Sequence, residues 1–332
     1  MRQLMISLDK TILDTGSASA RRMIEYGKHD ELFIIVPANK EMQVDLSPTV
    51  HVNSVGGNKA CQFFGLYWLG LKLIKEKNIQ HITSQDPFFI GLIGWRLSRR
   101  AHVPLEVQLH GDFYGSNYYR RSGIANAVRY YIGLFVIAHA DRVRCVGERI
   151  KRSLVVRGIS EEKIIVQPVR VNTEYIKGYQ PKFDIHAKYP DARIIFLCLG
   201  RLDPVKNIPW LVKVFAEVSY THPNVLLLIV GDGVERDRIV QLIKQLGMEK
   251  NIKMEGWTSD PYSYLKSADC LLFPSLSEGY GMVVVEALAA GRRVIMNDVG
   301  VANFEVVPSE NVAIVPVGDK KQFKNAIESV CG

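Results

Sequence analysis

The stretch Pro274–Gly291, PSLSEGYGMVVVEALAAG, decides the fold, and the rest of the chain is organised around it. It is predicted to form the end of a strand, a loop that carries glycines, and then a helix from about Met282 to Ala290. This helix is apolar on nearly every face, which is typical of a helix buried in a core. Gly291 stands where a glycine is expected to end it.

Two acidic residues stand out in this stretch. Glu286 lies in the middle of the apolar helix, where a buried carboxylate is costly without a partner, and Glu278 lies in the preceding loop. Gly279 and Gly281 let backbone amides approach a ligand closely, and a helix start suits a phosphate group. In a purely structural alternative, Glu278 caps the helix and Glu286 pairs with a core arginine. The two acids, the two glycines and the helix start together favour a ligand.

The frame EGYGM…EALAAG, with seven residues between Glu278 and Glu286, resembles the signature of family-4 glycosyltransferases. The resemblance is strong over residues 194–291 and looser before them. It implies an α/β chain of the GT-B fold, in which two Rossmann-like domains face each other across a deep cleft. It also implies a retaining hexosyltransferase that takes a sugar from a nucleoside diphosphate.

A second motif carries two permanent cations. Gly200–Asn207, GRLDPVKN, follows a predicted strand at Ile194–Leu199, and Arg201 and Lys206 flank the turn. Two such cations suit a diphosphate and stabilise the charge that grows on a departing nucleotide. A solvated turn would explain either cation alone, whereas the pair at this spacing favours a ligand. The motif is similar to the family stretch whose Arg and Lys touch the diphosphate.

The resemblance implies roles for single residues. Glu286 would accept hydrogen bonds from ribose hydroxyls, and Glu278 would orient the transferred sugar. His110 ends the strand Pro104–Leu109, where open α/β sheets bind ligands, and would lie near the anomeric centre. The predicted catalytic residues are therefore His110, Glu278, Arg201 and Lys206. The predicted donor-binding residues are Arg201, Lys206, Glu278, Gly281, Met282, Val283, Glu286 and, in the first loop, Gly16.

Two of these assignments have structural alternatives. Gly16 lies in the segment DTGSAS, which also suits a simple turn and helix N-cap, and a lone histidine such as His110 is more often structural. No metal site and no separate cofactor are expected, because the chain has no Asp-x-Asp and the two cations can neutralise the diphosphate. The donor is expected to be linked to UDP or GDP rather than ADP. Gly231-Asp232-Gly233 lacks the third glycine of a dinucleotide-binding fingerprint, so NAD binding is not predicted.

Length and pattern indicate two domains. The 332 residues suit two domains of roughly 150 each, and alternating apolar and helical runs predict parallel sheets. We expect an acceptor-side domain at residues 1–173 and a nucleotide-sugar-binding domain at 174–332, with a polar linker over 172–192. Many relatives continue into a helix that returns across the first domain, and here we expect that helix to be missing or shortened.

The net charge of +8 is uneven: residues 1–178 hold 25 lysines and arginines against 16 acids, and residues 179–332 hold 17 against 18. This asymmetry predicts an anionic surface or acceptor for the first half. The aromatic and basic residues of Tyr114–Arg121 and Arg129–Tyr131 suit a peripheral membrane contact, and equally a solvated face. No motif for nucleic acid accompanies them. A glycan or lipid-linked acceptor is expected.

The five cysteines are scattered, and Cys145, Cys198 and Cys270 lie in apolar runs, which favours reduced thiols. The start MRQLMISLDK lacks the apolar region of a signal peptide, and no apolar run is long enough to span a bilayer. The expected location is cytoplasmic, with a peripheral position at the inner face of the plasma membrane as an extension of that expectation.

Several alternatives remain open at this stage. An inactive GT-B subunit would bind a nucleotide sugar without releasing nucleotide to any acceptor. A phosphorylase would consume inorganic phosphate, and an epimerase would interconvert nucleotide sugars with no acceptor. A basic membrane or nucleic-acid module would lose binding on charge reversal at Arg120 and Arg121 and would ignore Glu278→Ala. The preferred prediction is a transferase of cell-surface polysaccharide or glycolipid synthesis.

Overall fold

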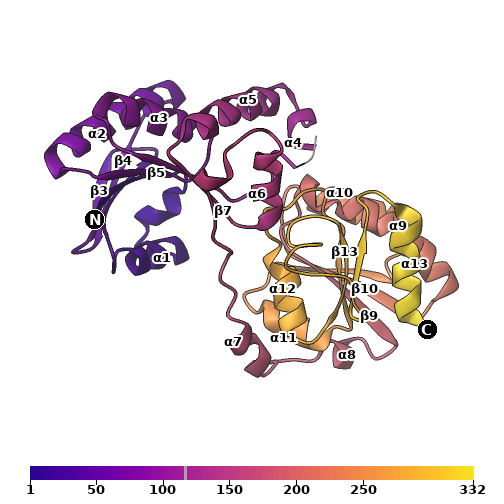
Figure 1. Ribbon diagram of the computed structural model, residues 1–332. Coiled ribbons are helices and arrows are strands. Elements are labelled where there is room, and N and C mark those ends of the chain that lie inside the picture. The colour runs from indigo at the N-terminus through magenta and orange to yellow at the C-terminus, as the bar shows by residue number, and fades with distance from the viewer. Residues whose placement is uncertain (116–117) are drawn as a thin grey trace. The chain divides into compact units, whose positions relative to one another are not determined.

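The computed structural model describes residues 1–115 and 118–332 and divides the chain into two compact α/β units (Figure 1). Unit 1 is Met1–Gln167 and unit 2 is Pro168–Gly332, so the division falls before the expected boundary at 173/174. Ser116 and Asn117, in the aromatic and basic segment singled out above, lie outside the described residues. No helix of the described chain is long and apolar enough to cross a membrane.

Unit 1 contains an eight-stranded sheet in the order β3-β4-β2-β1-β5-β6-β7-β8. Every neighbouring pair is parallel except β3 and β4. The order reverses between β1 and β5. The strands are β1 Arg2–Ile6, β2 Glu31–Pro37, β3 Met42–Ser47, β4 Val50–Val55, β5 His81–Ser84, β6 Leu105–Leu109, β7 Arg142–Cys145 and β8 Ile164–Val166.

Helices cover both faces of this sheet: α2, α3 and α5 lie side by side on one face, and α1 lies on the other (Figure 1). Single side chains start two of them, since Ser17 caps α1 and Asn58 caps α2. The helices are α1 Ala18–Tyr26, α2 Lys59–Lys77, α3 Phe89–Ala101, α4 Tyr118–Arg121, α5 Ile124–His139 and α6 Glu148–Val155, with short 3-10 turns η1 Lys10–Leu13 and η2 Glu161–Lys163.

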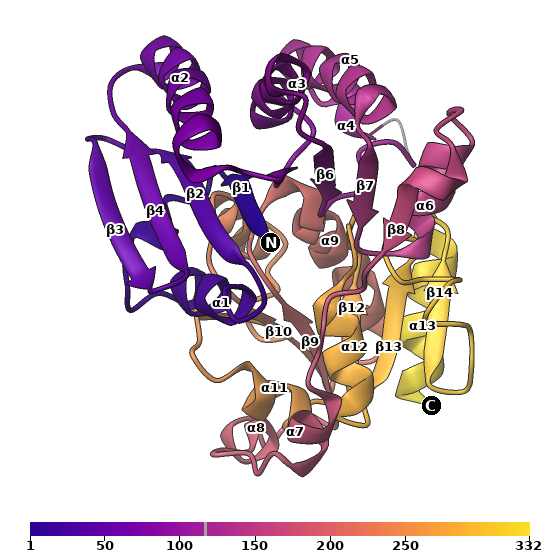
Figure 2. The same ribbon diagram turned by 60° about the vertical axis from the view of Figure 1, so that its left-hand side comes forward.

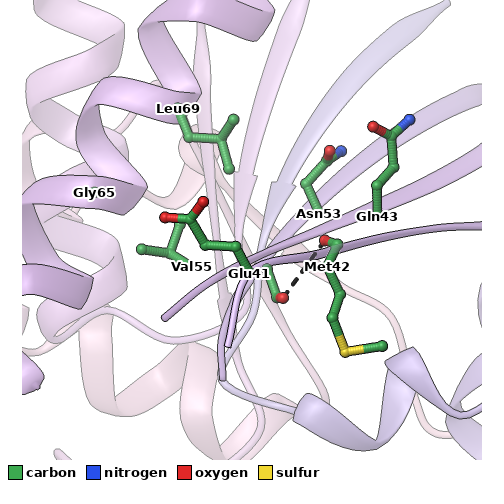
Figure 3. A pocket seen from close by; sticks show the side chains of 8 residues that line it. Glu41, Met42, Gln43, Asn53, Val55, Gly65 and Leu69 are labelled. Atoms are coloured by element: carbon green, nitrogen blue, oxygen red, sulfur yellow. Dashed lines mark hydrogen bonds between the residues drawn. The ribbon is translucent and has the colours of Figure 1, made fainter. Parts of the chain in front are cut away.

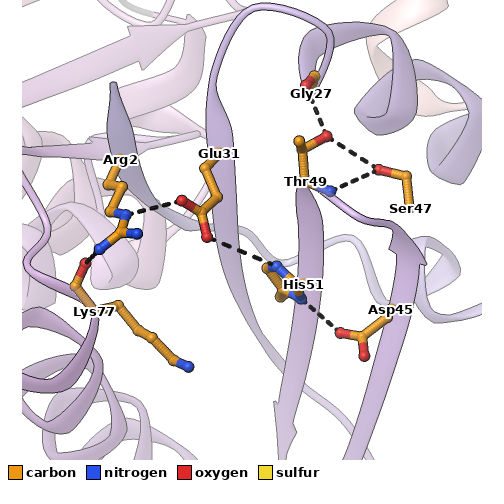
Figure 4. A network of polar contacts seen from close by, with 8 residues as sticks. All are labelled: Arg2, Gly27, Glu31, Asp45, Ser47, Thr49, His51 and Lys77. Atoms are coloured by element: carbon orange, nitrogen blue, oxygen red, sulfur yellow. Dashed lines mark hydrogen bonds and ion pairs between the residues drawn. The ribbon is translucent and has the colours of Figure 1, made fainter.

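A polar network ties together the starts of the first strands (Figure 4). Arg2 donates to the Glu31 carboxylate at 2.8 Å and to the backbone oxygen of Lys77 at 3.1 Å. The His51 ring lies 4.0 Å from Glu31 and 2.7 Å from Asp45. The network therefore joins β1, β2, β4, β3 and the end of α2 at the edge opposite to the carboxyl ends of the parallel strands.

Unit 2 is a six-stranded, fully parallel sheet in the order β11-β10-β9-β12-β13-β14. Numbered within the unit, this is 3-2-1-4-5-6, the order of a dinucleotide-binding sheet. One apolar core lies on each face. The strands are β9 Ile194–Leu199, β10 Val225–Val230, β11 Ile252–Gly256, β12 Cys270–Phe273, β13 Arg293–Asn297 and β14 Val312–Val315.

The helices of unit 2 include two short ones where the sequence predicted a linker. Ile176 in the first and Ile185 in the second are fully buried in the core of unit 2, so the linker expected over residues 172–192 was wrong. Each short helix buries a single isoleucine, so the sequence shows no repeating apolar pattern that would predict a helix there. The helices are α7 Thr173–Gly178, α8 Ile185–Lys188, η3 Pro204–Lys206, α9 Ile208–Thr221, α10 Arg236–Gln245, α11 Pro261–Ser267, α12 Met282–Ala289 and α13 Lys320–Cys331.

Candidate functional site

The site of unit 2 follows from its strand order. The order reverses between β9 and β12, so the loops that leave these adjacent strands run toward opposite faces of the sheet. A crevice outside the carboxyl ends at such a point is where open α/β sheets bind ligands. The loop after β9 is Gly200–Asn207 and the loop after β12 is Pro274–Gly281, which are the two motifs singled out in the sequence.

Lys206 and Glu278 meet across this point. The Lys206 Nζ atom donates to Glu278 Oε1 at 2.6 Å, and the two side chains are only 21% and 14% exposed. The same ammonium lies 5.4 Å from the centroid of the Phe273 ring at the end of β12, within the range of a cation–π contact. Two residues that are 72 positions apart in the sequence therefore form one charged cluster.

The start of α12 lies beside this cluster. Gly281 is the N-cap residue, with φ +95°, and no side chain within residues 1–115 and 118–332 caps the first amides of the helix. Glu278 therefore does not cap α12, and the capping alternative was wrong. The first N–H groups of a helix have no partner within it, so the amides at Met282 and Val283 lie at the positive end of the helix dipole.

Glu286 lies one turn into α12 and is half-buried. No hydrogen bond or ion pair of its carboxylate occurs within residues 1–115 and 118–332, so pairing with a core arginine was also wrong. Burial raises the pKa of this carboxyl group above its ordinary value. Tyr262 is close enough that the Glu286 charge adds to the effect of burial in raising the pKa of the phenol.

Arg201 differs from Lys206 in being exposed. Its Nη1 atom lies 3.1 Å from Asp203 Oδ2, and 81% of the side chain is accessible. Its loop is held by the turn after β10, where the backbone oxygen of Asp232 accepts from the Leu202 amide at 2.9 Å. A Cβ on Gly231 would lie 1.9 Å from the Gly200 oxygen, so only glycine fits there.

Trp257 lies at the exit of β11 and is 74% exposed. The ring therefore lies outside the core of unit 2. It stands at the carboxyl edge of the same sheet as Lys206 and Glu278.

Gly16 and His110 belong to unit 1, unlike the other predicted site residues. Around Gly16 the chain forms a turn, in which the Gly16 amide donates to Asp14 at 3.0 Å and Ser17 caps α1. His110 is exposed directly after β6. The desolvation imposed by surrounding protein, with smaller effects of the Arg144 and Arg22 charges, lowers the pKa of its ring, which favours the neutral imidazole near neutral pH.

Sequence reasoning missed the support of the Glu278 loop. Asn297, fully buried at the end of β13, donates to the backbone oxygens of Pro274 at 2.7 Å and Ser275 at 3.1 Å. Gly300 has φ +57°, and a Cβ there would lie 2.2 Å from the Tyr280 oxygen. An asparagine at the carboxyl end of a predicted strand, followed closely by glycine, was the available signal.

A separate pocket of about 400 Å³ lies in unit 1 between α2 and the β3–β4 hairpin (Figure 3). Gln43 and Asn53 point into it from the two strands, and Leu69 and Gly65 face it from α2. None of the predicted site residues lines this pocket. The charged cluster of unit 2 is therefore the better candidate site.

Two family models match the chain. The model described as "Glycosyl transferases group 1" matches residues 181–331, and the model described as "Glycosyltransferase Family 4" matches residues 28–175. The chain belongs to the family-4 glycosyltransferases. The first of the two models spans every unit 2 residue predicted to bind the donor.

Curated relatives of this family-4 chain match it in part. An uncharacterized glycosyltransferase of Methanocaldococcus jannaschii is 32% identical over 36% of the chain and 30% of the relative. A phosphatidylinositol N-acetylglucosaminyltransferase subunit of Saccharomyces cerevisiae is 29% identical over 53% and 39%. The chain thus spans about a third of the length of these relatives. A galactosyltransferase of Escherichia coli, named for a GlcNAc-diphosphoundecaprenol substrate, is 26% identical over 78% and 68%.

Solved structures show the fold. The Anabaena protein HepE, in complex with UDP, superposes with a TM-score of 0.75 at 18% identity, covering 99% of this chain and 89% of that one. A sucrose-phosphate synthase of Thermosynechococcus elongatus gives a TM-score of 0.78 at 20% identity with the same coverage. The GT-B fold class predicted from the sequence is therefore confirmed.

Proposed function

We propose that this protein is a retaining glycosyltransferase that moves a hexosyl group from a UDP- or GDP-linked donor to a glycan or lipid-linked acceptor. The observation that carries the proposal is the 2.6 Å contact of Lys206 with Glu278 beside the uncapped start of α12. It brings a cation for phosphate, a carboxylate for hydroxyl groups and free helix amides to the one point of the sheet where ligands bind.

Each group suits one part of the donor. Lys206 and the amides at Gly281, Met282 and Val283 bind the diphosphate, and the exposed Arg201 closes on it from the solvent side. An ionised carboxylate only accepts hydrogen bonds, so Glu286, which has no partner among the described residues, is suited to ribose hydroxyls. Glu278 accepts from hydroxyls of the transferred sugar and so orients it.

The proposed step needs no base from the protein. The bond between the anomeric carbon and the phosphate oxygen breaks, and its electron pair stays on the diphosphate. The acceptor oxygen bonds to the anomeric carbon on the same face, and the acceptor proton passes to the departing phosphate oxygen, so the configuration is kept. Lys206 and Arg201 stabilise the growing negative charge, and the step uses no metal.

His110 is the proposed contribution of unit 1. Its lowered pKa keeps the ring neutral near neutral pH, and a neutral imidazole has one donor and one acceptor nitrogen. Such a ring can bond a sugar hydroxyl without repelling a positively polarised anomeric carbon. His110→Ala is expected to reduce transfer and to leave nucleoside diphosphate binding unchanged. His29→Ala, at an exposed position after α1, is the control.

The acceptor class is proposed from the relatives. One matching protein is named as a phosphatidylinositol N-acetylglucosaminyltransferase subunit, another for a diphosphoundecaprenol substrate, and a third as a monoglucosyldiacylglycerol synthase. All three names contain a lipid. A lipid-linked acceptor at the inner face of the plasma membrane fits the basic first half of the chain, and would assign the protein to polysaccharide or glycolipid synthesis.

The test begins by measuring the melting temperature of the protein in the presence of UDP, GDP or ADP. We call the nucleotide that raises the melting temperature most the selected nucleotide. Release of the selected nucleotide is then measured with its common sugars and a panel of lipid acceptors, and the product is analysed by NMR for its anomeric configuration. We expect acceptor-dependent release with retention. Release without any acceptor requirement, or inversion, would contradict the mechanism. Failure with every donor and acceptor would favour an inactive subunit.

Two substitutions examine the site itself. Lys206→Ala and Glu278→Ala are each expected to reduce the rate of transfer by more than about tenfold, which is the effect expected when a hydrogen bond to a charged group is lost. Circular dichroism should show that both variants remain folded. Lys250→Ala and Glu249→Ala, on the exposed end of unit 2, are matched controls that should keep full activity. Near-normal rates in both site variants would refute the assignment.

A further inference from the structure

A stripe of exposed side chains runs along α2. Phe64 and Trp68 are 60% and 65% exposed, although both are large and apolar. Lys72 and Lys75 continue the stripe at helical spacing and are exposed as well. Leu66, Gly70 and Leu73 form the buried side of the same helix. The outer face of α2 therefore passes from aromatic at its start to basic at its end.

The next helix repeats this pattern, and a third adds a row of apolar side chains. On α3, Phe89 at the start is 50% exposed, and Arg99 and Arg100 end the helix on the outside. On α5, exposed apolar side chains recur at helical spacing. They are Ile124 at 87%, Val128 at 53%, Tyr131 at 60% and Phe135 at 41% exposed.

These stripes belong to one surface. The Phe63 ring of α2 lies 6.4 Å from the Phe89 ring of α3, and Trp95 of α3 lies 4.9 Å from Phe135 of α5. Figure 2 shows α3 between its two neighbours. We call this surface the three-helix face, formed by the outward residues of α2, α3 and α5.

The charge of the three-helix face has one sign. The three helices together contain eight lysines and arginines and a single acid, Glu76. Arg99, Arg100, Lys72 and Lys75 have no ion pair among the described residues. Unneutralised cations beside exposed aromatic rings need a partner that is anionic and apolar at once.

We infer that the three-helix face docks on a lipid bilayer with anionic headgroups. Aromatic side chains insert at the level of the headgroups, and lysine and arginine reach their phosphates. A second copy of the chain is a poorer partner, because a symmetric contact would press two surfaces of the same positive sign together. A nucleic acid would meet the cations but would leave Ile124 and Phe135 without an apolar partner.

The orientation of the three-helix face suits delivery of a lipid-anchored acceptor, an argument that rests on the proposed function. In a parallel α/β sheet each helix begins beyond the carboxyl end of the preceding strand. Phe64, Phe89 and Ile124 lie near the starts of their helices, so the apolar end of the face is at the ligand-binding edge of the sheet. A docked unit 1 therefore receives an acceptor that is itself anchored in lipid.

The test is flotation of the full chain with phosphatidylcholine vesicles and with vesicles that also contain phosphatidylglycerol. We expect binding only to the anionic vesicles, weakened by salt. Phe64→Ser with Trp68→Ser, and separately Arg99→Glu with Arg100→Glu, are each expected to weaken binding by about tenfold or more. Tyr220→Ser, and Lys244→Glu with Lys250→Glu, change exposed residues of unit 2 and should bind as the wild type.

Several results would overturn this inference. One is absence of binding to the anionic vesicles, and another is equal loss in the control variants. A dimer in solution that the Phe64/Trp68 pair abolishes would assign the face to a second copy instead. Thermal shift by the selected nucleotide separates the two proposals. If the chain binds vesicles but no nucleotide raises its melting temperature, only the proposed function is wrong. If a nucleotide raises the melting temperature but the chain does not bind vesicles, only the docking surface is wrong.

Discussion

Lys206 and Glu278 neutralise each other, so a diphosphate that approaches Lys206 competes with a carboxylate 2.6 Å from the ammonium. The two residues are consequently not independent contributors to donor binding. Removing Lys206 leaves Glu278 as an unpaired negative charge facing the diphosphate. Removing the charge of Glu278 instead releases Lys206 for the ligand.

The first prediction follows from this competition. Glu278→Gln is expected to bind the selected nucleotide more tightly than the wild type, while sugar transfer falls by about tenfold or more because a carboxylate no longer orients the sugar. Isothermal titration calorimetry measures the first effect and nucleotide release the second. Glu249→Gln serves as the control. Weaker nucleotide binding by Glu278→Gln would show that the ion pair assists the ligand rather than competing with it.

The second prediction concerns Glu286, whose pKa burial raises above 4.5. The folded state then binds a proton more readily than the unfolded state, so stability falls as pH rises from about 4.5 through the raised pKa. Glu286→Gln is expected to raise the melting temperature near pH 7 and to have little effect below the window. Calorimetry at several pH values checks this. A variant less stable at neutral pH would reveal a hidden partner of the carboxylate.

The sequence was sufficient to single out Glu278, Glu286, Arg201 and Lys206, because their motifs have defined spacing beside predicted strands. It could not pair Lys206 with Glu278. That contact depends on β9 and β12 being neighbours, which is a property of strand order rather than of either motif. The same reason explains why the support from Asn297 escaped notice.

At the level of elements, the loop that carries Glu278 is held from the side of β13. Asn297 fixes its start through two backbone oxygens, and the Val301 amide donates to the Tyr280 oxygen at 2.8 Å. The segment Asn297–Val301 therefore sets the position of the Glu278 loop through the side-chain amide of Asn297 and the backbone amide of Val301. The two elements should respond together to a change in either one.

The third prediction uses a pair of glycines. Gly300→Ala would place a Cβ 2.2 Å from the Tyr280 oxygen, whereas Gly318→Ala meets no atom within 4 Å. Both positions have positive φ, at +57° and +85°, so the backbone strain is comparable. Gly300→Ala is expected to lower both the melting temperature and the rate of transfer more than Gly318→Ala, because only the first adds a clash at the Glu278 loop. Equal activity of the two variants would show that the Glu278 loop does not depend on this contact.

Elements with continuous apolar runs were predictable, and those with single anchors were not. β10, VLLLIV, is buried at every position, and such a continuous apolar run predicts a strand. β3, MQVDLS, is an edge strand with no fully buried residue, and it has no such run because its apolar residues have no core to face. α7 and α8 were missed for a related reason, since each buries one isoleucine.

At the level of the whole molecule, each unit has its own sheet and apolar cores. Units with separate cores can unfold separately. All predicted site residues except Gly16 and His110 lie in unit 2, so a nucleotide ligand should stabilise mainly that unit. The expected boundary at 173/174 was close to the observed division, but the buried Ile176 assigns α7 firmly to the second core.

The fourth prediction is that calorimetry resolves two unfolding transitions, of which the selected nucleotide raises only one. A ligand stabilises the folded state that binds it by RT ln(1 + [L]/Kd), where [L] is the free ligand concentration. Hydrogen exchange measured by mass spectrometry assigns the shifted transition, and protection is expected over β9, β12 and α12. An equal shift of both transitions would mean that the nucleotide binds both units with similar strength.

The outward stripes of α2, α3 and α5 have a kinetic consequence. A protein held by this face no longer searches three dimensions for a lipid-anchored molecule, and instead meets it by lateral diffusion within the leaflet. Turnover then follows the surface density of the acceptor in the membrane rather than its bulk concentration. Diluting the acceptor with inert anionic lipid at constant total acceptor would slow the reaction, although neither enzyme nor substrate has changed in amount.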